Sequence, residues 1–189
     1  MNRQCRTSPP APWTNLFLTG PTRAGKTTLL FRTLLATRMR VGGFAVGGFA
    51  VKRVYRYGRC VRMDMIDLAS RSRGRLVTFD ASGMPAVTAE VFVTVGIPAI
   101  ETALRDAQVV VMDEIGRFEL KVPAFLEAVE TALDSPVPVV GIIKDESNPF
   151  LDKVRSRRDI RLVRVVKDRR EEARREFERL LATLLSRQE

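Results

Sequence analysis

The sequence predicts an α/β protein whose mostly parallel sheet is covered by helices on both faces. Short apolar runs recur along the chain, and stretches with apolar residues at helical spacing lie between them. The runs are nearly continuous in apolar residues, as expected for strands that are buried on both faces. A chain of 189 residues, 45% hydrophobic and 29% charged, is also long enough for one domain with a substantial core.

The first expected unit is a strand, a glycine-rich loop and a helix. The apolar run LFLT at residues 16–19 is the strand, and Gly20 ends it. Residues 27–39 follow as a helix, because leucine and threonine recur there at helical spacing. The residues at this spacing are Leu29, Leu30, Thr33, Leu34 and Thr37.

The next part of the chain predicts a hairpin. Residues 42–51 read GGFAVGGFAV, but repeat architectures need longer units and at least three copies. We interpret this segment as a glycine-rich turn that leads into a strand. Residues 51–67 hold two β-prone pieces around Tyr57-Gly58, typical of a hairpin added to the sheet. The arginine-rich segment SRSRGR at residues 70–75 is expected to be a mobile surface loop.

The rest of the chain alternates between strands and helices. We expect strands at residues 109–112, 137–143 and 160–166, a helix at 123–133 and a terminal helix from about residue 168.

The terminal helix carries apolar residues on one face, which predicts packing on the sheet. These residues are Phe177, Leu180, Leu181, Leu184 and Leu185. Glu171 and Arg175 are spaced to pair on another face. A basic helix that binds nucleic acid is the less favoured alternative, because glutamates are interleaved with the arginines and no aromatic stacking set is present.

Composition excludes several kinds of site. The chain has no histidine and only two cysteines, Cys5 and Cys60, so zinc sites built on imidazole or paired thiolates are excluded. Ser-His-Asp and Cys-His catalytic sets are excluded for the same reason. The 32 basic residues against 22 acidic ones give a formal charge of +10, which favours anionic partners without naming one.

The amino-terminal stretch MNRQCRTSPPAPWTN is polar and rich in proline, so it predicts a loose tail and not a secretory signal. We expect a flexible tail at residues 1–14 and one domain at residues 15–189. No segment approaches the roughly 18 consecutive apolar residues of a membrane span. We therefore expect a cytoplasmic protein without a membrane partner, as a monomer or a weak oligomer.

The strongest chemical signal is GPTRAGKT at residues 20–27, which fits the phosphate-binding pattern G-x-x-x-x-G-K-[ST] between a strand and a helix. Gly20 and Gly25 let the backbone wrap so that successive N–H groups face phosphate oxygens. Lys26 is expected to bridge the β- and γ-phosphates, and Thr27 to bind Mg²⁺. The alternative is an ordinary glycine turn that caps a helix. The candidate nucleotide-binding residues here are Gly20, Pro21, Thr22, Arg23, Ala24, Gly25, Lys26, Thr27 and Thr28, with Thr28 placed for the α-phosphate.

A second signal is VVVMDEIGRFEL at residues 109–120, where four apolar residues run into two adjacent acids. Neighbouring carboxylates beside a core strand repel each other and lose water, so a cation is expected nearby. In P-loop proteins such an acid holds magnesium, which we assign to Asp113. Glu114, expected just beyond the strand end, is placed to orient or deprotonate a water. The alternative is that both are solvated loop acids.

These segments resemble the RecA-like P-loop nucleoside-triphosphatases, the family that includes the animal cancer-related nucleoside-triphosphatase. The resemblance covers nearly the whole chain after residue 14, and the DEIG-x-x-E-L part is its most specific motif. It implies a three-layer P-loop fold with an appended hairpin. It also implies Mg²⁺-dependent hydrolysis of nucleoside triphosphates (ATP, GTP or others) to diphosphate and phosphate. The matching segments are 19–30, 47–59, 109–120 and 155–170.

Carried over by position, the resemblance implies that Lys26 and Glu114 are catalytic and that Thr27 and Asp113 bind the metal. Glu119 matches the second acid of the motif, whose role the resemblance does not define. The chain departs from the family at two places. Lys52 and Arg53 stand where acids are usual, which changes how the site is closed or charged. Arg169 precedes Arg170 where Asn-Arg is usual, which puts base recognition in doubt.

Two arginines remain weaker candidates. Arg170 keeps the family's arginine and is retained as a contact that stacks on the base. Arg23 lies within the glycine-rich loop and either reaches a phosphate or points to solvent.

Three functions are therefore open. Hydrolysis of nucleoside triphosphates leads. A nucleotide-binding adaptor would show little hydrolysis without its partner. A small-molecule kinase would need an arginine-rich lid, for which residues 70–75 are a poor candidate.

Overall fold

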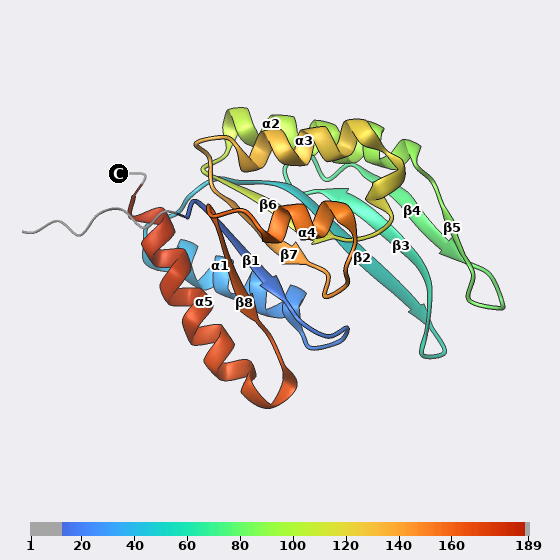
Figure 1. The fold of residues 1–189 in the computed structure, drawn as a ribbon, viewed down its shortest axis with the longest axis horizontal. Helices are drawn as coiled ribbons and strands as arrows, with labels where there is room; N and C mark the ends of the chain where they lie inside the picture. Colours follow the sequence, from blue (N-terminus) through green and yellow to red (C-terminus); the bar gives the residue numbers. More distant parts are fainter. Residues whose placement is uncertain (1–12, 188–189) are drawn as a thin grey trace, which may run out of the picture.

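The fold centres on one eight-stranded sheet in the computed structural model, which describes residues 13–187 (Figure 1). The strands are β1 (Asn15–Thr19), β2 (Val46–Arg56), β3 (Arg59–Asp67), β4 (Arg73–Phe79), β5 (Pro85–Val87), β6 (Val109–Ile115), β7 (Val139–Ile143) and β8 (Ile160–Arg164). Their order across the sheet is β5-β4-β3-β2-β6-β7-β1-β8. Most of the expected tail at residues 1–14, including Cys5, lies outside the described residues.

Five helices and three short helical turns accompany the sheet. The helices are α1 (Lys26–Arg40), α2 (Ile97–Asp106), α3 (Pro123–Leu133), α4 (Pro149–Arg155) and α5 (Arg170–Leu185). The turns are η1 (Phe92–Gly96), η2 (Glu119–Lys121) and η3 (Lys167–Arg169). Within residues 13–187, no helix is both long and apolar enough to cross a membrane.

The sheet has a parallel part and an antiparallel extension. Strands β2, β6, β7, β1 and β8 pair in parallel, whereas β3, β4 and β5 add to β2 in antiparallel fashion. The α/β class, the mostly parallel sheet and the hairpin at residues 51–67 are confirmed. The loop expected at residues 70–75 is wrong in its second half, because Arg73 and Arg75 already pair with β3 in strand β4.

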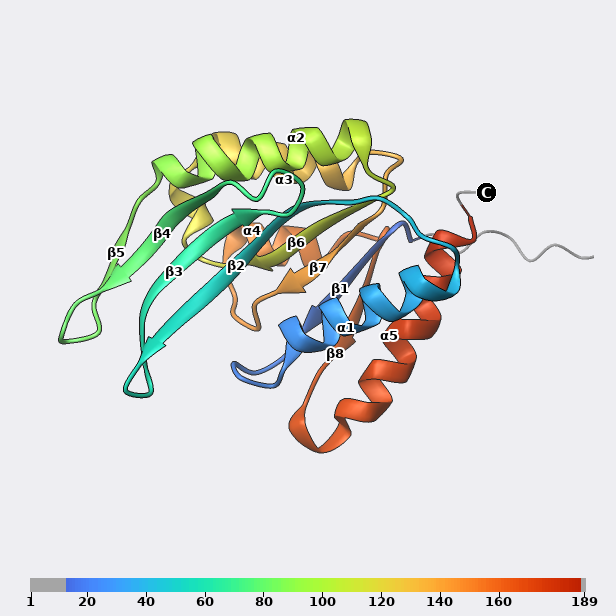
Figure 2. The same cartoon turned by 180° about the vertical axis from the view of Figure 1, so that it is seen from behind.

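Helices cover both faces of the parallel part. Helices α2, α3 and α4 pack on one face, and α1 and α5 pack on the other (Figures 1 and 2). The first core layer contains the rings of Phe49, Phe92 and Phe125, which contact one another in tilted arrangements. The second contains Phe177 of α5, buried with Leu180, Leu181 and Leu184, so the predicted packing of the terminal helix is confirmed. Its Glu171 and Arg175 form the expected ion pair at 3.3 Å.

The repeated glycines serve two different purposes. Gly42 and Gly43 form the turn after α1 with positive φ angles, as interpreted from the sequence. Gly47 lies inside β2, where a Cβ atom would come within 2.6 Å of the Ala103 Cβ. Helix α2 therefore approaches β2 more closely than any larger residue would permit.

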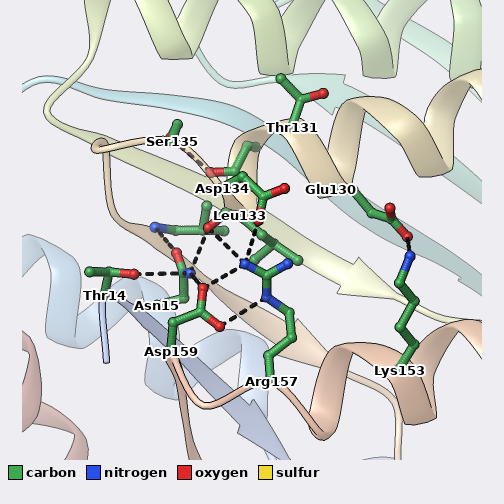
Figure 3. Close-up of polar contacts among 12 residues, drawn as sticks. Thr14, Asn15, Glu130, Thr131, Leu133, Asp134, Ser135, Lys153, Arg157 and Asp159 are labelled. Atoms are coloured by element: carbon green, nitrogen blue, oxygen red, sulfur yellow. Dashed lines mark hydrogen bonds and ion pairs between the residues drawn. The ribbon is translucent and has the colours of Figure 1, made fainter. Parts of the chain in front are cut away.

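A buried polar network ties the ends of several elements together at the start of β1 (Figure 3). The Asn15 side chain, fully buried, donates to the Leu133 carbonyl at 3.1 Å and accepts from the Val139 backbone N–H at 3.0 Å. It also donates to Asp159, which Arg157 holds at 2.6 Å. The network joins β1, β7 and the end of α3 at the sheet edge opposite the glycine-rich loop, so it fixes the fold without entering the site.

Candidate active site

The glycine-rich loop connects β1 to α1 as expected. Gly20 and Gly25 adopt φ angles of +124° and +89°, which residues with a Cβ rarely reach. The Lys26 ammonium, itself buried, donates to the Gly20 carbonyl at 2.7 Å and the Pro21 carbonyl at 2.8 Å. Burial lowers the pKa of Lys26 from its ordinary value, and the charge of Glu114 opposes this effect.

A cavity of about 320 Å³ opens beside this loop. It lies at the carboxyl-terminal edge of the parallel strands, where ligands of open α/β sheets usually bind. Its walls come from the loop and α1 on one side and from β2, β6 and the segment after β7 on the other. The lining residues are Gly20, Pro21, Thr22, Arg23, Gly25, Lys26, Thr27, Thr28, Arg53, Tyr55, Glu114, Arg117, Lys144, Asp145 and Glu146.

The two adjacent acids lie within β6 and not beyond it. The strand runs through Ile115, so the predicted end at residue 112 and the placement of Glu114 outside the strand are wrong. Pairing with β7 shifts register between Asp113 and Ile115, leaving Glu114 as an extra residue. Such a bulge re-aims a side chain locally, and Glu114 lines the cavity although the strand continues.

Asp113 sits beside the metal-binding threonine predicted from the sequence. Its Oδ1 accepts from the Thr27 hydroxyl at 3.3 Å. Its Oδ2 is buried and has no hydrogen-bond partner among the described residues. Burial, assisted by the charge of Glu114, raises the pKa of Asp113 to about 7. The charges of Arg53 and Lys26 act in the opposite direction, but among residues 13–187 neither forms an ion pair with Asp113.

Glu114 forms ion pairs with two basic side chains. Its carboxylate lies 2.5 Å from the Arg53 guanidinium and 3.7 Å from the Lys144 ammonium. Arg53 comes from β2 and Lys144 follows β7, so three neighbouring strands converge on this group. Arg53, which stands where the family usually has an acid, thus pairs with the predicted catalytic acid Glu114. This departure from the family therefore adds a positive charge directly beside that acid.

Glu119 lies apart from the cavity walls. Its side chain is only 4% exposed, and its Oε2 has no hydrogen-bond partner within residues 13–187. Burial raises the pKa of Glu119 to about 7, while backbone amides of Glu119 and Gly116 act in the opposite direction. Glu119 is thus a buried acid that borders the site without lining it.

The remaining candidates separate into two groups. Arg23 and Thr28 line the cavity. The Ala24 side chain is instead buried in the core under α1, so only its backbone belongs to the loop surface. The Arg170 guanidinium lies against Gly25, close enough that a Cβ there would be 2.7 Å from its carbon, but Arg170 is not among the cavity-lining residues.

Several lining residues had no specific sequence signal. Tyr55 and Arg117 lie inside segments that carry the family resemblance, but at positions to which no role was assigned, and Lys144, Asp145 and Glu146 lie outside those segments. The residues after β7 could have been found, because that strand was expected and carboxyl ends of parallel strands meet at one edge. Arg117 directly follows the DEIG motif, and its guanidinium lies 5.4 Å from the Phe118 ring centroid.

Comparison with known proteins identifies the family that these features suggest. A family model described as NTPase matches residues 15–177. The chain belongs to this family. The glycine-rich loop, both candidate metal ligands and Glu114 all lie inside the region that the NTPase family model covers.

Relatives of the NTPase family match nearly the full length of the chain. The nucleoside-triphosphatase THEP1 of Thermofilum pendens is 36% identical over 182 residues, covering 92% of this chain and 98% of that protein. A cancer-related nucleoside-triphosphatase homolog of Mus musculus is 29% identical over 174 residues, covering 82% and 90%. The predicted resemblance is therefore confirmed.

Solved structures of the NTPase family share the fold. A crystal structure of THEP1 from Aquifex aeolicus has a TM-score of 0.73 at 23% identity, covering 88% of this chain and 98% of the other. A solution structure of a human cancer-related nucleoside triphosphatase has a TM-score of 0.72 at 27% identity, covering 88% and 96%. The predicted three-layer P-loop fold is confirmed.

Proposed function

We propose that this chain is a Mg²⁺-dependent nucleoside-triphosphatase that cleaves the bond between the β- and γ-phosphates of ATP, GTP or other nucleoside triphosphates. The observation that carries the proposal is one cavity that brings Lys26 and Thr27 together with Glu114, directly beside the buried Asp113. Membership of the NTPase family supports the same reaction.

The metal would be held by Thr27 and Asp113. Their oxygens already lie 3.3 Å apart, and the second Asp113 oxygen is buried without a partner. Within residues 13–187 there is no cluster of three or more acidic, histidine or cysteine side chains suited to a metal. This donor set fits Mg²⁺, which usually takes one or two protein oxygens and completes its shell with phosphates and water. When bound, the ion neutralises charge on the β- and γ-phosphates.

Phosphate binding would fall to the loop backbone and Lys26. Positive φ angles at Gly20 and Gly25 support a loop whose N–H groups face a bound anion. Helix α1 begins at Lys26, so its positive end adds to the attraction. The Lys26 ammonium would exchange its bonds to the loop carbonyls for bonds to the phosphates. Arg23, Thr22 and Thr28 line the same wall, and Arg170 against Gly25 is the proposed contact to the base.

Glu114 would position the attacking water. Its carboxylate lines the cavity opposite the loop, and Arg53 and Lys144 keep it oriented. The glutamate accepts a hydrogen bond from water, which attacks the γ-phosphorus in line with the leaving diphosphate. Arg53 and Lys144 also place positive charge where the γ-phosphate would enter, which would stabilise the negative charge spread over its equatorial oxygens in the transition state.

The two alternatives are not favoured. A kinase lid at residues 70–75 has little support, because Arg73 and Arg75 belong to β4 and neither lines the cavity. An adaptor with little hydrolysis would not need an acid with two cationic partners facing the phosphate site. We further propose that the protein acts in the cytoplasm as a monomer or a weak oligomer.

The test is phosphate release from ATP and GTP, measured with Mg²⁺ and with or without candidate acceptors. Lys26→Ala should abolish nucleotide binding. Glu114→Gln should retain binding and lower turnover by a factor of ~10² or more. Unchanged turnover in Glu114→Gln would refute its assignment, and phosphate release that falls as acceptor phosphorylation rises would favour the kinase.

A further inference from the structure

In the part of the chain that the structure describes, one face of the antiparallel extension carries no helix. The second half of β2 together with β3, β4 and β5 reaches beyond the parallel part, and within residues 13–187 the helical elements that pack on it are α2, α3 and the preceding turn η1, on one side (Figures 1 and 2). On that side Met63, Met65 and Val77 are buried. Because side chains alternate along a strand, Asp64, between Met63 and Met65, faces the uncovered side. Arg75 faces the same side because it pairs with Asp64, where the β3–β4 ladder shifts register after the Met63–Val77 pair.

The uncovered face is basic. Pairing across β2, β3 and β4 places Lys52 beside Asp64 and Asp64 beside Arg75. Arg62 lies on β3 and Arg73 on β4. A hollow in this face is lined by Arg62, Asp64, Arg73, Gly74 and Arg75. We define the basic face as Lys52, Arg62, Arg73 and Arg75, arranged around Asp64.

Little negative charge compensates this face. Residues 51–79 contain eight basic and two acidic residues. Asp64 pairs with Arg62 at 3.1 Å, and Asp67 is satisfied by Ser70 and the backbone of the adjacent turn. Lys52, Arg73 and Arg75 are exposed, and among residues 13–187 no acid forms an ion pair with them. Folding therefore gathers these cations without neutralising them.

The tip of the same hairpin adds exposed aromatic and basic side chains. Tyr57 is fully exposed in the turn between β2 and β3, and Arg56 and Arg59 flank it. From Lys52 to Tyr57 the strand extends about 17 Å, at ~3.4 Å per residue. A strip of cations with an aromatic ring at one end is the combination that binds phosphodiester backbones and stacks unpaired bases.

We propose that the basic face and the Tyr57 tip bind single-stranded nucleic acid. Arg73 and Arg75 are two residues apart on one strand, about 7 Å, and Lys52 lies two strands away, about 10 Å. These side chains can therefore contact several successive phosphates of one chain. The exposed ring at the tip favours an unpaired strand, because bases in a duplex are not free to stack on it. This surface faces away from the helices α2 and α3 and involves none of the residues assigned to hydrolysis.

The test uses 20-nucleotide oligo-uridine and oligo-thymidine with a fluorescent label, and anisotropy at several salt concentrations. With four cations in contact, the logarithm of the affinity should fall with the logarithm of salt at a slope of about −3. The double variant Arg73→Glu, Arg75→Glu should bind at least ~10-fold more weakly at moderate salt. Tyr57→Asn, which suits the positive φ of that turn, should weaken binding about fivefold or more.

The matched control is Arg105→Glu, Lys121→Glu, which makes the same charge change at exposed residues on α2 and just before α3. It should change affinity less than about twofold. Equal losses in the two double variants would overturn the proposal, because net charge alone would then explain binding. Binding to anionic phosphatidylserine vesicles but not to either oligonucleotide would also overturn it.

Nucleoside-triphosphatase activity provides the check on folding. It should be unchanged in the double variant of the basic face, because Arg73 and Arg75 do not line the cavity. If the glutamate substitutions unfold the protein, Arg73→Gln, Arg75→Gln serves the same purpose. Retained oligonucleotide affinity in that folded variant would refute the assignment of the site.

Discussion

Glu119 offers a sharp test of the electrostatics around the site. The folded protein raises its pKa from 4.5 to about 7, chiefly because the side chain is buried. The folded state therefore binds this proton more tightly than the unfolded chain does. Consequently the group favours folding below pH 4.5, and that advantage is lost as the pH rises toward 7. The difference in pKa corresponds to about 3 kcal/mol of unfolding free energy.

Replacing Glu119 with glutamine removes the titration while keeping the size of the side chain. The unfolding free energy of Glu119→Gln minus that of the wild type should therefore increase by about 3 kcal/mol between pH 4.5 and pH 8. Urea denaturation followed by circular dichroism, in buffers without divalent metal, measures this difference at each pH. Other titrating groups, including Asp113, are present in both proteins and largely cancel.

Glu127→Gln on α3 is the matched control, because Glu127 is exposed to solvent, whereas Glu119 is buried. Its difference from the wild type should stay level across the same range. A level difference for Glu119→Gln as well would refute the reasoning, since burial would then not control the ionisation of this acid.

Four further outcomes follow from the structure. Arg53→Met should lower turnover by ~10-fold, and by much less in a Glu114→Gln background, as measured by a double-mutant cycle of phosphate release. Gly47→Ala should destabilise by about 1–3 kcal/mol in urea denaturation, and Ala103→Gly should restore part of the loss. Asn15→Ala should cost about 3 kcal/mol of stability without changing turnover, because its partners are left buried and unpaired. Chelation with EDTA should abolish phosphate release, and added Mg²⁺ should restore it.

The sequence predicted the parallel part of the fold well, because its strands are short apolar runs and its helices are regular. The antiparallel extension was harder to predict from the sequence. Strand β4 begins within an arginine-rich segment, and its pairing depends on β3 and not on its own composition. The segment VFVTVG at residues 91–96 contains β-branched residues, which favour strands, yet it forms η1 and leads into α2 because burial of Phe92 and Ile100 stabilises a helical path.

The residues of the site likewise fall into a group that the sequence predicts and a group that it does not. Lys26, Thr27 and Asp113 follow from local motifs, and the structure brings them together. The pairing of Arg53 with Glu114 depends on β2 lying next to β6, which motif spacing does not reveal. The bulge at Glu114 is likewise a property of pairing with β7. Side-chain contacts between neighbouring strands are therefore the part of the site that a single sequence does not predict.

Strand β7 lies between β1 and β6, so the two proposed metal ligands come from elements that are not sheet neighbours: Asp113 lies on β6, and Thr27 lies on α1, which follows β1. Nevertheless Thr27 and Asp113 are within hydrogen-bond distance, because β1 and β6 both pair with β7 and α1 starts directly after the glycine-rich loop that follows β1. The separation of Thr27 and Asp113 is thus set by the sheet together with the start of α1. Binding of a metal–nucleotide complex should then require little ordering of the protein, and its entropic penalty should fall mainly on the ligand.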